Sequence, residues 1–110
     1  METQEQSLWT LELERAAQAF AAIGSEPRLA VLLALVRAGP DGLTVGDIQA
    51  RLEMPASTLA HHLKLLVAAG LVDQTRRGRS IVNHASFDRI RSLAGYLLEE
   101  CCAEIGGECE

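Results

Sequence analysis

Residues 54–72 constrain the fold of this 110-residue chain most strongly, because they join a helical pattern to a stop signal and the start of a strand. The apolar residues that share the spacing of one buried helical stripe are Leu59, Leu63, Leu66 and Val67. Gly70 follows the stripe, as is typical of a helix C-terminus, and a strand-like run begins at Leu71. The stretch therefore predicts a half-buried helix that turns directly into a β-strand.

The opposite face of this predicted helix carries small and polar residues and no acid. Its members are Ala56, Ser57, Ala60, His61 and Lys64. Hydrogen-bonding side chains in the first two turns, followed by a lysine, suit a helix that enters the major groove of DNA. An ordinary amphipathic helix with a solvated face has a similar composition, so this stretch alone leaves both interpretations open.

Several neighbouring motifs follow one another in a known order and nearly without gaps. They are Ser25-Glu-Pro-Arg-Leu29, Leu43-Thr-Val-Gly-Asp-Ile48, Ser57-Thr-Leu-Ala-His-His-Leu-Lys64, Ala69-Gly-Leu-Val72 and Arg76-Arg-Gly-Arg79. Together they resemble the ArsR/SmtB family of winged helix-turn-helix repressors. The resemblance, which covers a little over half of the chain, implies a mainly α fold with a β-hairpin wing, in the order α-α-α-α-β-β-α. The length allows one domain, which we expect over residues 1–110. The resemblance also implies a homodimeric transcriptional repressor that binds an imperfectly palindromic DNA operator, and we expect no enzyme activity.

The DNA contacts are expected on two segments. The predicted reading helix offers Ser57, Thr58, His61 and Lys64, and a predicted hairpin around Gly78 carries Arg76, Arg77 and Arg79. Arginines on a protruding hairpin are commonly only solvated, but beside such a helix we expect them to contact phosphate or the minor groove. His62 lies at the edge of the apolar stripe and is expected to be structural, and His84 is expected to be packed or solvated.

The net charge of −5 at first opposes a nucleic-acid partner, because DNA affinity depends largely on neutralising phosphates. The distribution of charge removes this objection. Residues 1–25 contain four acids and one base, and residues 93–110 contain five acids and no base. Residues 26–92 contain nine bases and six acids, so the central part of the chain is positively charged.

Helical periodicity predicts dimerising terminal helices over residues 5–23 and about 87–103. The first has a stripe of Trp9, Leu13, Ala16, Phe20 and Ile23, and the second has Phe87, Ile90, Ala94, Leu97 and Cys101. With 48% hydrophobic residues, the chain has more apolar surface than so small a core can bury, which favours a partner subunit. Between them, Ser25 is expected to cap a helix whose buried stripe is Leu29, Leu32, Leu33 and Val36, and Thr44 to cap a short helix to Leu52.

Three cysteines, Cys101, Cys102 and Cys109, lie in or beside a glycine-containing tail of about residues 104–110 that is expected to be flexible. An odd, clustered number does not suit a disulfide framework, and three thiolates match a trigonal site for As(III), whereas structural zinc takes four ligands. Some members of the family sense arsenite through a comparable C-terminal trio. The thiol-containing motif of other arsenic sensors is replaced here by Thr44-Val-Gly-Asp-Ile48, and the terminal helix lacks the histidines of the family's zinc sites.

We therefore predict As(III), or Sb(III) or a methylated As(III) species, as an inducer that dissociates the protein from DNA. A redox or persulfide sensor that closes a disulfide remains an alternative, as do unused thiols. A small thiol oxidoreductase is disfavoured because Cys-x-x-Cys and a βαβ pattern are both missing from the sequence. Neither a membrane-spanning run nor a signal-peptide pattern occurs, so a cytoplasmic protein without membrane contact is expected.

Overall fold

The computed structural model describes the backbone of residues 2–99 and 103–105, and side chains from residue 12 to 99 and at 104 and 105. The elements in chain order are α1 (Glu2–Ile23), α2 (Glu26–Ala38), a 3₁₀ turn (Gly39–Asp41), β1 (Leu43–Thr44), α3 (Val45–Leu52), α4 (Ala56–Ala68), β2 (Val72–Arg77), β3 (Ser80–Ala85), α5 (Phe87–Glu99) and a second 3₁₀ turn (Ala103–Ile105). This is a mainly helical winged helix-turn-helix fold with a three-stranded antiparallel sheet, and the predicted fold class is confirmed.

The hydrophobic core lies where α2, α3 and α4 meet the base of the sheet. Its largest fully buried apolar side chains are Leu35, Ile48, Leu59, Leu66, Leu71, Val31 and Val72. Each of the four elements contributes at least one of them, so α4 is fixed against several neighbours at once.

The predicted buried face of α2 is partly wrong. Leu29 and Leu33 are 37% and 39% exposed, whereas the helix buries Val31, Leu32, Ala34 and Leu35. Because this helix is apolar around most of its circumference, periodicity does not identify the inner face, and packing against α4 selects it. Ser25 occupies the N-cap position as predicted, but its side chain makes no capping hydrogen bond.

The face that α1 turns to its own domain shares Ala16 and the half-buried Ile23 with the stripe predicted for the dimer interface. The residues buried there are Ala16, Ala19 and Ala22, while Leu13 and Phe20 are exposed. Alanine side chains allow the helix backbone to approach its neighbours closely, and the larger side chains remain on the outside. The side chain of Trp9 lies outside the described part of the chain.

The wing is the predicted hairpin with one additional strand. The strand order is β1-β3-β2, and the short strand β1, which was not predicted, pairs Leu43 with Asn83 and Thr44 with Val82. Asn83 is fully buried and donates from Nδ2 to the Leu43 carbonyl oxygen at 3.2 Å, while its Oδ1 accepts from Gln74 Nε2 at 2.8 Å. These bonds connect all three strands and hold the hairpin against the helical core.

Local signals define the ends of the shorter elements. Thr44 caps α3 in a reciprocal capping box with Asp47, with both side-chain to backbone distances at 3.1 Å, as the sequence predicted for Thr44. Gly70 has φ of +78° directly after α4 and before β2. The described part of α5 ends at Glu99, so most of the predicted extension to residue 103 lies outside the described residues.

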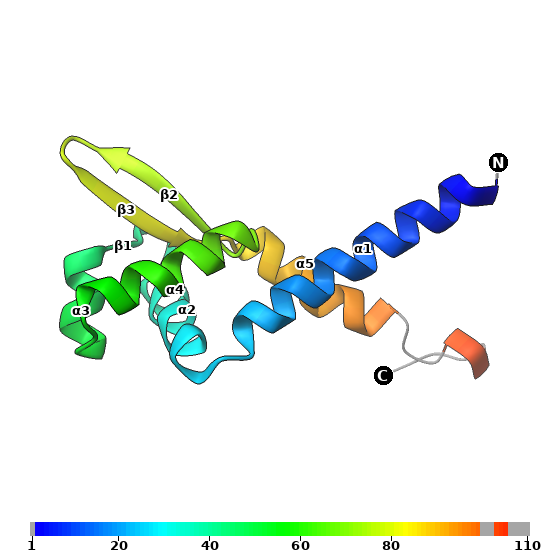
Figure 1. Cartoon of the computed structure of the whole chain (residues 1–110), viewed down its shortest axis with the longest axis horizontal. Coiled ribbons are helices and arrows are strands. Elements are labelled where there is room, and N and C mark those ends of the chain that lie inside the picture. The colour runs from blue at the N-terminus through cyan, green and yellow to red at the C-terminus, as the bar shows by residue number, and fades with distance from the viewer. Residues whose placement is uncertain (1, 100–102, 106–110) are drawn as a thin grey trace.

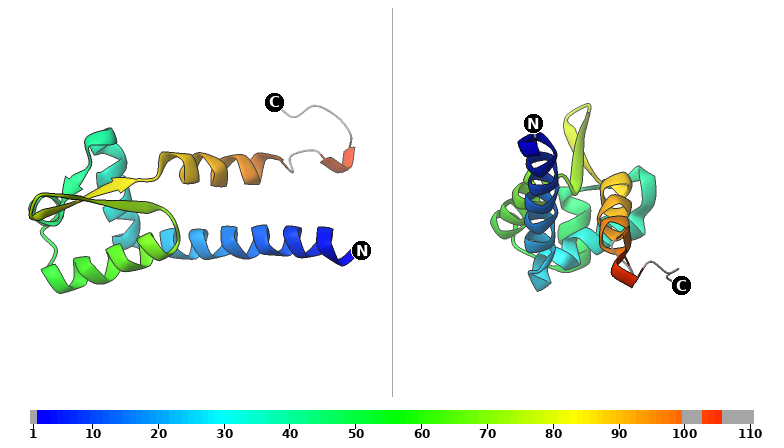
Figure 2. Two further views of the ribbon diagram at one scale, coloured as in Figure 1. Left: turned by 90° about the horizontal axis from the view of Figure 1, so that it is seen from above. Right: turned by 90° about the vertical axis from the view of Figure 1, so that its right-hand side faces the viewer.

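Figures 1 and 2 show that α1 and α5 run beside each other in opposite directions on one side of the molecule. The tip of the wing and the beginning of α4 lie at the other end, away from the N-terminus of α1. Among the described residues, no single helix is long and apolar enough to cross a membrane. The segments Glu12–Ile23 and Glu26–Asp41, which meet at an angle of 96°, would together be long and apolar enough, by length and composition alone.

Candidate nucleic-acid interface

The outer face of α4 matches the predicted reading surface. Every residue predicted for it is exposed, namely Ser57, Thr58, His61 and Lys64, and the intervening Ala56 and Ala60 are exposed as well. The first turn contains no acidic residue. On the other side the helix buries Leu59, His62, Leu63 and Leu66, so its orientation is set by the core and the polar face is left free.

The N-terminus of α4 also presents backbone donors. Its N-cap residue is Pro55, which provides no side-chain cap, and the first helical hydrogen bond runs from Leu59 N to the Pro55 carbonyl oxygen at 3.0 Å. The amides of the three preceding helical residues therefore have no acceptor within the helix. Together with the positive end of the helix dipole, they favour a phosphate at this position.

The turn between α3 and α4 is held by backbone and side-chain bonds. Glu53 has φ of +52° in the left-handed region, and its N–H donates to the Gln49 carbonyl oxygen at 2.7 Å. The Gln49 side chain in turn donates to the Met54 carbonyl oxygen at 3.4 Å. This tight connection fixes α4 relative to α3, which is the arrangement of a helix-turn-helix unit.

Val67 was predicted on the buried stripe of α4, and this is wrong because its side chain is 37% exposed. His62 occupies the buried face instead and is 8% exposed, so its predicted structural role is confirmed. Its Nδ1 has no hydrogen-bond partner among the described residues. Burial, followed by the charges of Arg28 and His61, lowers the pKa of His62, which favours the neutral form of the ring.

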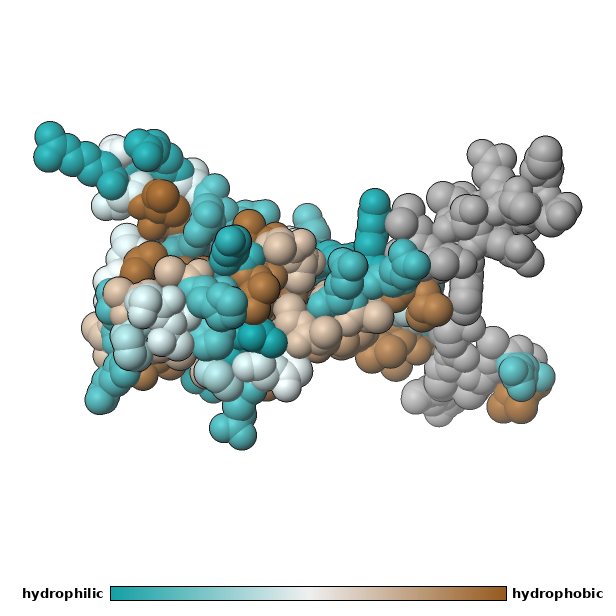
Figure 3. Space-filling view, in the orientation of Figure 1, coloured by the Kyte–Doolittle hydropathy of each residue, from teal (hydrophilic) through white to brown (hydrophobic). Residues whose placement is uncertain are grey.

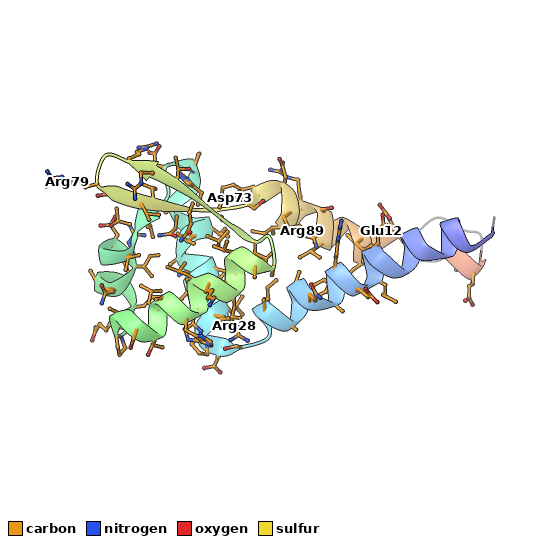
Figure 4. All side chains as sticks on the ribbon, turned by 45° about the horizontal axis from the view of Figure 1, so that its top comes forward. Glu12, Arg28, Asp73, Arg79 and Arg89 are labelled. Carbon is orange, nitrogen blue, oxygen red and sulfur yellow. The ribbon has the colours of Figure 1, made fainter. Side chains whose placement is uncertain are left out.

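The wing tip carries the predicted cluster of bases. Arg76, Arg77 and Arg79 are all exposed, and Figure 4 shows Arg79 projecting from the tip of the hairpin. Gly78 has φ of +60°, and a Cβ there would meet no atom within 4 Å, so the tip is open to an approaching ligand. The ion pair formed within the described residues is Arg91 with Asp88, at 3.2 Å, so none of the three wing arginines is neutralised by a carboxylate in this part of the chain.

His84 lies on β3, away from the wing tip. Its Nδ1 is 3.0 Å from the Pro40 carbonyl oxygen, which requires a protonated Nδ1 if the two form a hydrogen bond. The contact joins the wing to the turn before β1. His84 is half-buried, in line with the prediction of a packed or solvated residue.

Apolar surface is concentrated on the two helices at the other end of the molecule. On α5, Leu97 and Leu98 are 60% and 70% exposed, and on α1, Leu13 and Phe20 are exposed. Figure 3 shows hydrophobic surface near the end of α5, beside the atoms drawn in grey. This surface has the composition of a protein contact and lies far from the wing tip.

The predicted sulfur site, Cys101, Cys102 and Cys109, lies outside the described residues. Within the described ranges, no group of three or more His, Cys, Asp or Glu side chains is arranged to hold a metal ion. Sequence reasoning also missed Arg15 and Arg89, whose contact joins α1 to α5 over 74 positions of sequence and left no local signal.

Three comparisons relate this geometry to known proteins. A family described as a helix-turn-helix domain matches residues 23–75. An uncharacterized HTH-type transcriptional regulator, MJ1325 of Methanocaldococcus jannaschii, is 32% identical over 80 residues, which cover 73% of this chain and 88% of that protein.

Two solved structures have the same fold. An ArsR-like transcriptional regulator from Rhodococcus sp. RHA1 aligns with a TM-score of 0.73 at 30% identity, covering 84% of both chains. The DNA-binding domain of Mb0332 from Mycobacterium bovis, described as a homodimeric winged helix-turn-helix and a possible ArsR-family regulator, aligns with a TM-score of 0.67 at 21% identity. The alignment covers 91% of this chain and 93% of that domain.

Proposed function

Because the chain belongs to the ArsR family of DNA-binding helix-turn-helix transcriptional regulators, we propose that it is a homodimeric repressor with an arsenite-responsive tail. Each protomer would place α4 in one half-site of an imperfectly palindromic operator. The observation that carries this proposal is the exposed, acid-free face at the start of α4, at the same end of the molecule as the wing arginines.

The two DNA-contacting surfaces differ in chemistry, and we assign them different tasks. Ser57, Thr58, His61 and Lys64 combine short hydrogen-bonding groups with one cation, which suits base edges and adjacent phosphates in the major groove. Arg76, Arg77 and Arg79 carry charge on an open hairpin, which suits phosphates or the minor groove. Base preference would therefore reside mainly in α4, and the wing would contribute affinity that depends on salt.

The proposed dimer forms through α1 and α5. Leu97 and Leu98 are more exposed than any other described large hydrophobic residue except Ile105. Burying them together with the outer face of α1 would account for the apolar surface that the single domain leaves uncovered. The Mycobacterium bovis domain of the same fold is described as homodimeric, which is consistent with a dimer here. In this proposal one domain comprises residues 1–110, with the terminal helices as its dimerising part.

The proposed inducer is As(III), or Sb(III) or a methylated As(III) species, bound by Cys101, Cys102 and Cys109. These three thiols are all the cysteines of the chain, and three soft ligands suit a trivalent metalloid. The tail follows α5, so capture of an ion there would act on the end of the proposed dimer interface. Release requires that the metalloid bind the low-affinity conformation more tightly, by the coupling of about 1–3 kcal/mol that is typical of allosteric proteins.

The testing experiment measures affinity for a duplex selected by the protein itself from a random pool, with and without arsenite. We expect arsenite to weaken binding by about fivefold or more, while zinc, cadmium and peroxide act less. The triple variant with serine at positions 101, 102 and 109 should bind the same duplex but ignore arsenite. Release of that variant by arsenite would refute the cysteine site, and release of the wild type by peroxide but not arsenite would replace it with a redox switch.

A further inference from the structure

A groove follows α1 across the last turn of α4. One part has a volume of about 290 Å³, with walls formed mainly by alanines and Leu65, and with Arg28 and Gln18 as its polar side chains. The next part has a volume of about 390 Å³ and contains Arg15 and Arg89. The two parts share Gln18, Ala68 and Ala69, so they form one groove with an apolar stretch beside a pair of arginines.

Within the described residues, neither arginine is neutralised by a neighbouring acid, and the Arg89 side chain is anchored to α1. Arg89 Nη2 donates to the backbone carbonyl oxygen of Arg15 at 3.3 Å, and Figure 4 shows Arg89 reaching from α5 toward α1. Glu12 and Glu99 line the adjoining cavity of about 230 Å³ that also contains both arginines, yet no carboxylate in the described chain lies within 4.0 Å of either guanidinium. A ligand carboxylate can therefore accept charge-assisted hydrogen bonds from this pair.

The end of α4 does not oppose an anion in this groove. The carbonyl oxygens of Leu65, Leu66 and Val67 accept hydrogen bonds from the N–H groups of Ala69, Leu71 and Gly70 at 3.1, 3.0 and 2.9 Å. These bonds satisfy three of the last carbonyl groups of the helix, which are otherwise the negative end of its dipole. The 390 Å³ part of the groove itself is lined by Arg15 and Arg89 and by no acidic side chain.

From this arrangement we infer that the groove binds a small organic carboxylate with an apolar body, as an effector that acts independently of the cysteine tail. The carboxylate would lie at Arg15 and Arg89, and the body would extend along α1 toward Ala22. Seven residues of helix separate these positions, a length of about 10 Å, which an extended eight-carbon acid matches. This effector goes beyond the proposed metalloid response.

The groove is placed to affect DNA binding. Its lining includes Ala68 and Ala69, at the end of the same helix whose first turns form the DNA-contacting face. Its walls include α1 and Arg89 of α5, the helices of the proposed dimer interface. A ligand that fills the groove would favour one placement of α4 relative to these helices, and it could shift operator affinity by its preference for that placement.

The binding test uses the full chain, octanoate as the probe and octanol as the uncharged control, by isothermal titration calorimetry. We expect octanoate to bind more tightly than octanol. Arg89→Gln should weaken octanoate binding about tenfold or more by removing the charged donor, and Ala68→Glu should do the same by adding a like charge at an exposed wall position. Arg91→Gln is the matched control, because Arg91 is on the same helix, pairs with Asp88 and does not line the groove.

Operator affinity supplies the second readout. Saturating octanoate should change the dissociation constant of the wild-type complex by about threefold or more, with no such change in Arg89→Gln. All variants should bind the operator with wild-type affinity in the absence of octanoate, which would show that they are folded. A failure of octanoate to act would then refute the effector groove without refuting the proposed repressor function. Three results would overturn the inference: no binding of octanoate, equal binding of octanol, or an operator affinity that octanoate does not change. The first would follow if a second copy of the chain filled the groove.

Discussion

Replacing Arg79 by alanine tests how the wing contributes to DNA binding. The side chain projects from the hairpin tip, and no carboxylate of the described chain neutralises it, so its replacement removes one positive charge without breaking an internal contact. In the proposed dimer both wings change, so two phosphate contacts are lost. Each contact contributes about 0.9 to the slope of log K against log salt, and Arg79→Ala should therefore reduce the magnitude of the slope by about 1.8.

The same arithmetic gives a ratio that can be measured directly. Between 50 and 200 mM salt, the advantage of the wild type over Arg79→Ala should shrink about 12-fold. Fluorescence anisotropy with the selected duplex and with an unrelated duplex measures the dissociation constants at both salt concentrations. The loss at low salt should be similar on the two duplexes, because a phosphate contact does not depend on base sequence.

Arg91→Ala is the matched control, since it removes an exposed arginine from α5, away from the wing tip. Its salt slope should equal that of the wild type. If Arg79→Ala retains the wild-type slope, the wing does not contact phosphates. If it weakens binding to the selected duplex alone, the side chain reads base edges instead.

Other consequences concern the dimer, the wing and the core. Leu97→Glu should raise the dimer dissociation constant about tenfold or more, because an unpaired carboxylate in an apolar interface costs over about 1.4 kcal/mol; sedimentation that shows an unchanged dimer would place the interface elsewhere. Gly42→Ala should destabilise the fold more than Gly78→Ala in urea unfolding, since both have positive φ but a Cβ at position 42 would also collide with the backbone oxygen of Asn83; equal losses would contradict this. Burial lowers the pKa of His62 in the folded state below its ordinary 6.5. The unfolded chain therefore binds this proton at a higher pH than the folded chain does, so the free energy of unfolding decreases as the pH falls below 6.5. The free energy of unfolding should thus fall less between pH 7 and pH 5 in His62→Leu than in the wild type, and identical pH profiles would contradict the assignment.

Local patterns in the sequence predicted the elements that carry the DNA-contacting surface. The helix that buries Leu59 and Leu63, the capping role of Thr44 and the hairpin around Gly78 all depend on neighbours within a few positions. The exposure of Ser57 and Lys64 then follows from helical geometry, because residues opposite a buried stripe face solvent. The placement of the candidate DNA-binding residues on one face was therefore predictable.

Tertiary packing decided what local patterns left ambiguous. In α2 a strongly apolar sequence offers several possible inner faces, and contact with α4 buries Val31 and Leu35 while Leu29 and Leu33 remain exposed. The strand β1 has two residues and little local signal, and it exists because β3 provides its hydrogen-bonding partner.

The groove between α1 and the end of α4 is the clearest case of a feature that only the tertiary structure determines. Arg15 and Arg89 are 74 positions apart and belong to helices that each form from their own local sequence. Their contact arises because α1 and α5 run in opposite directions beside the end of α4, where residues 68–70 complete the groove. Sequence determined by itself the helices, the hairpin and the face of α4, since these depend on short-range periodicity; the structure decided which distant surfaces meet, since that depends on packing among all the elements at once.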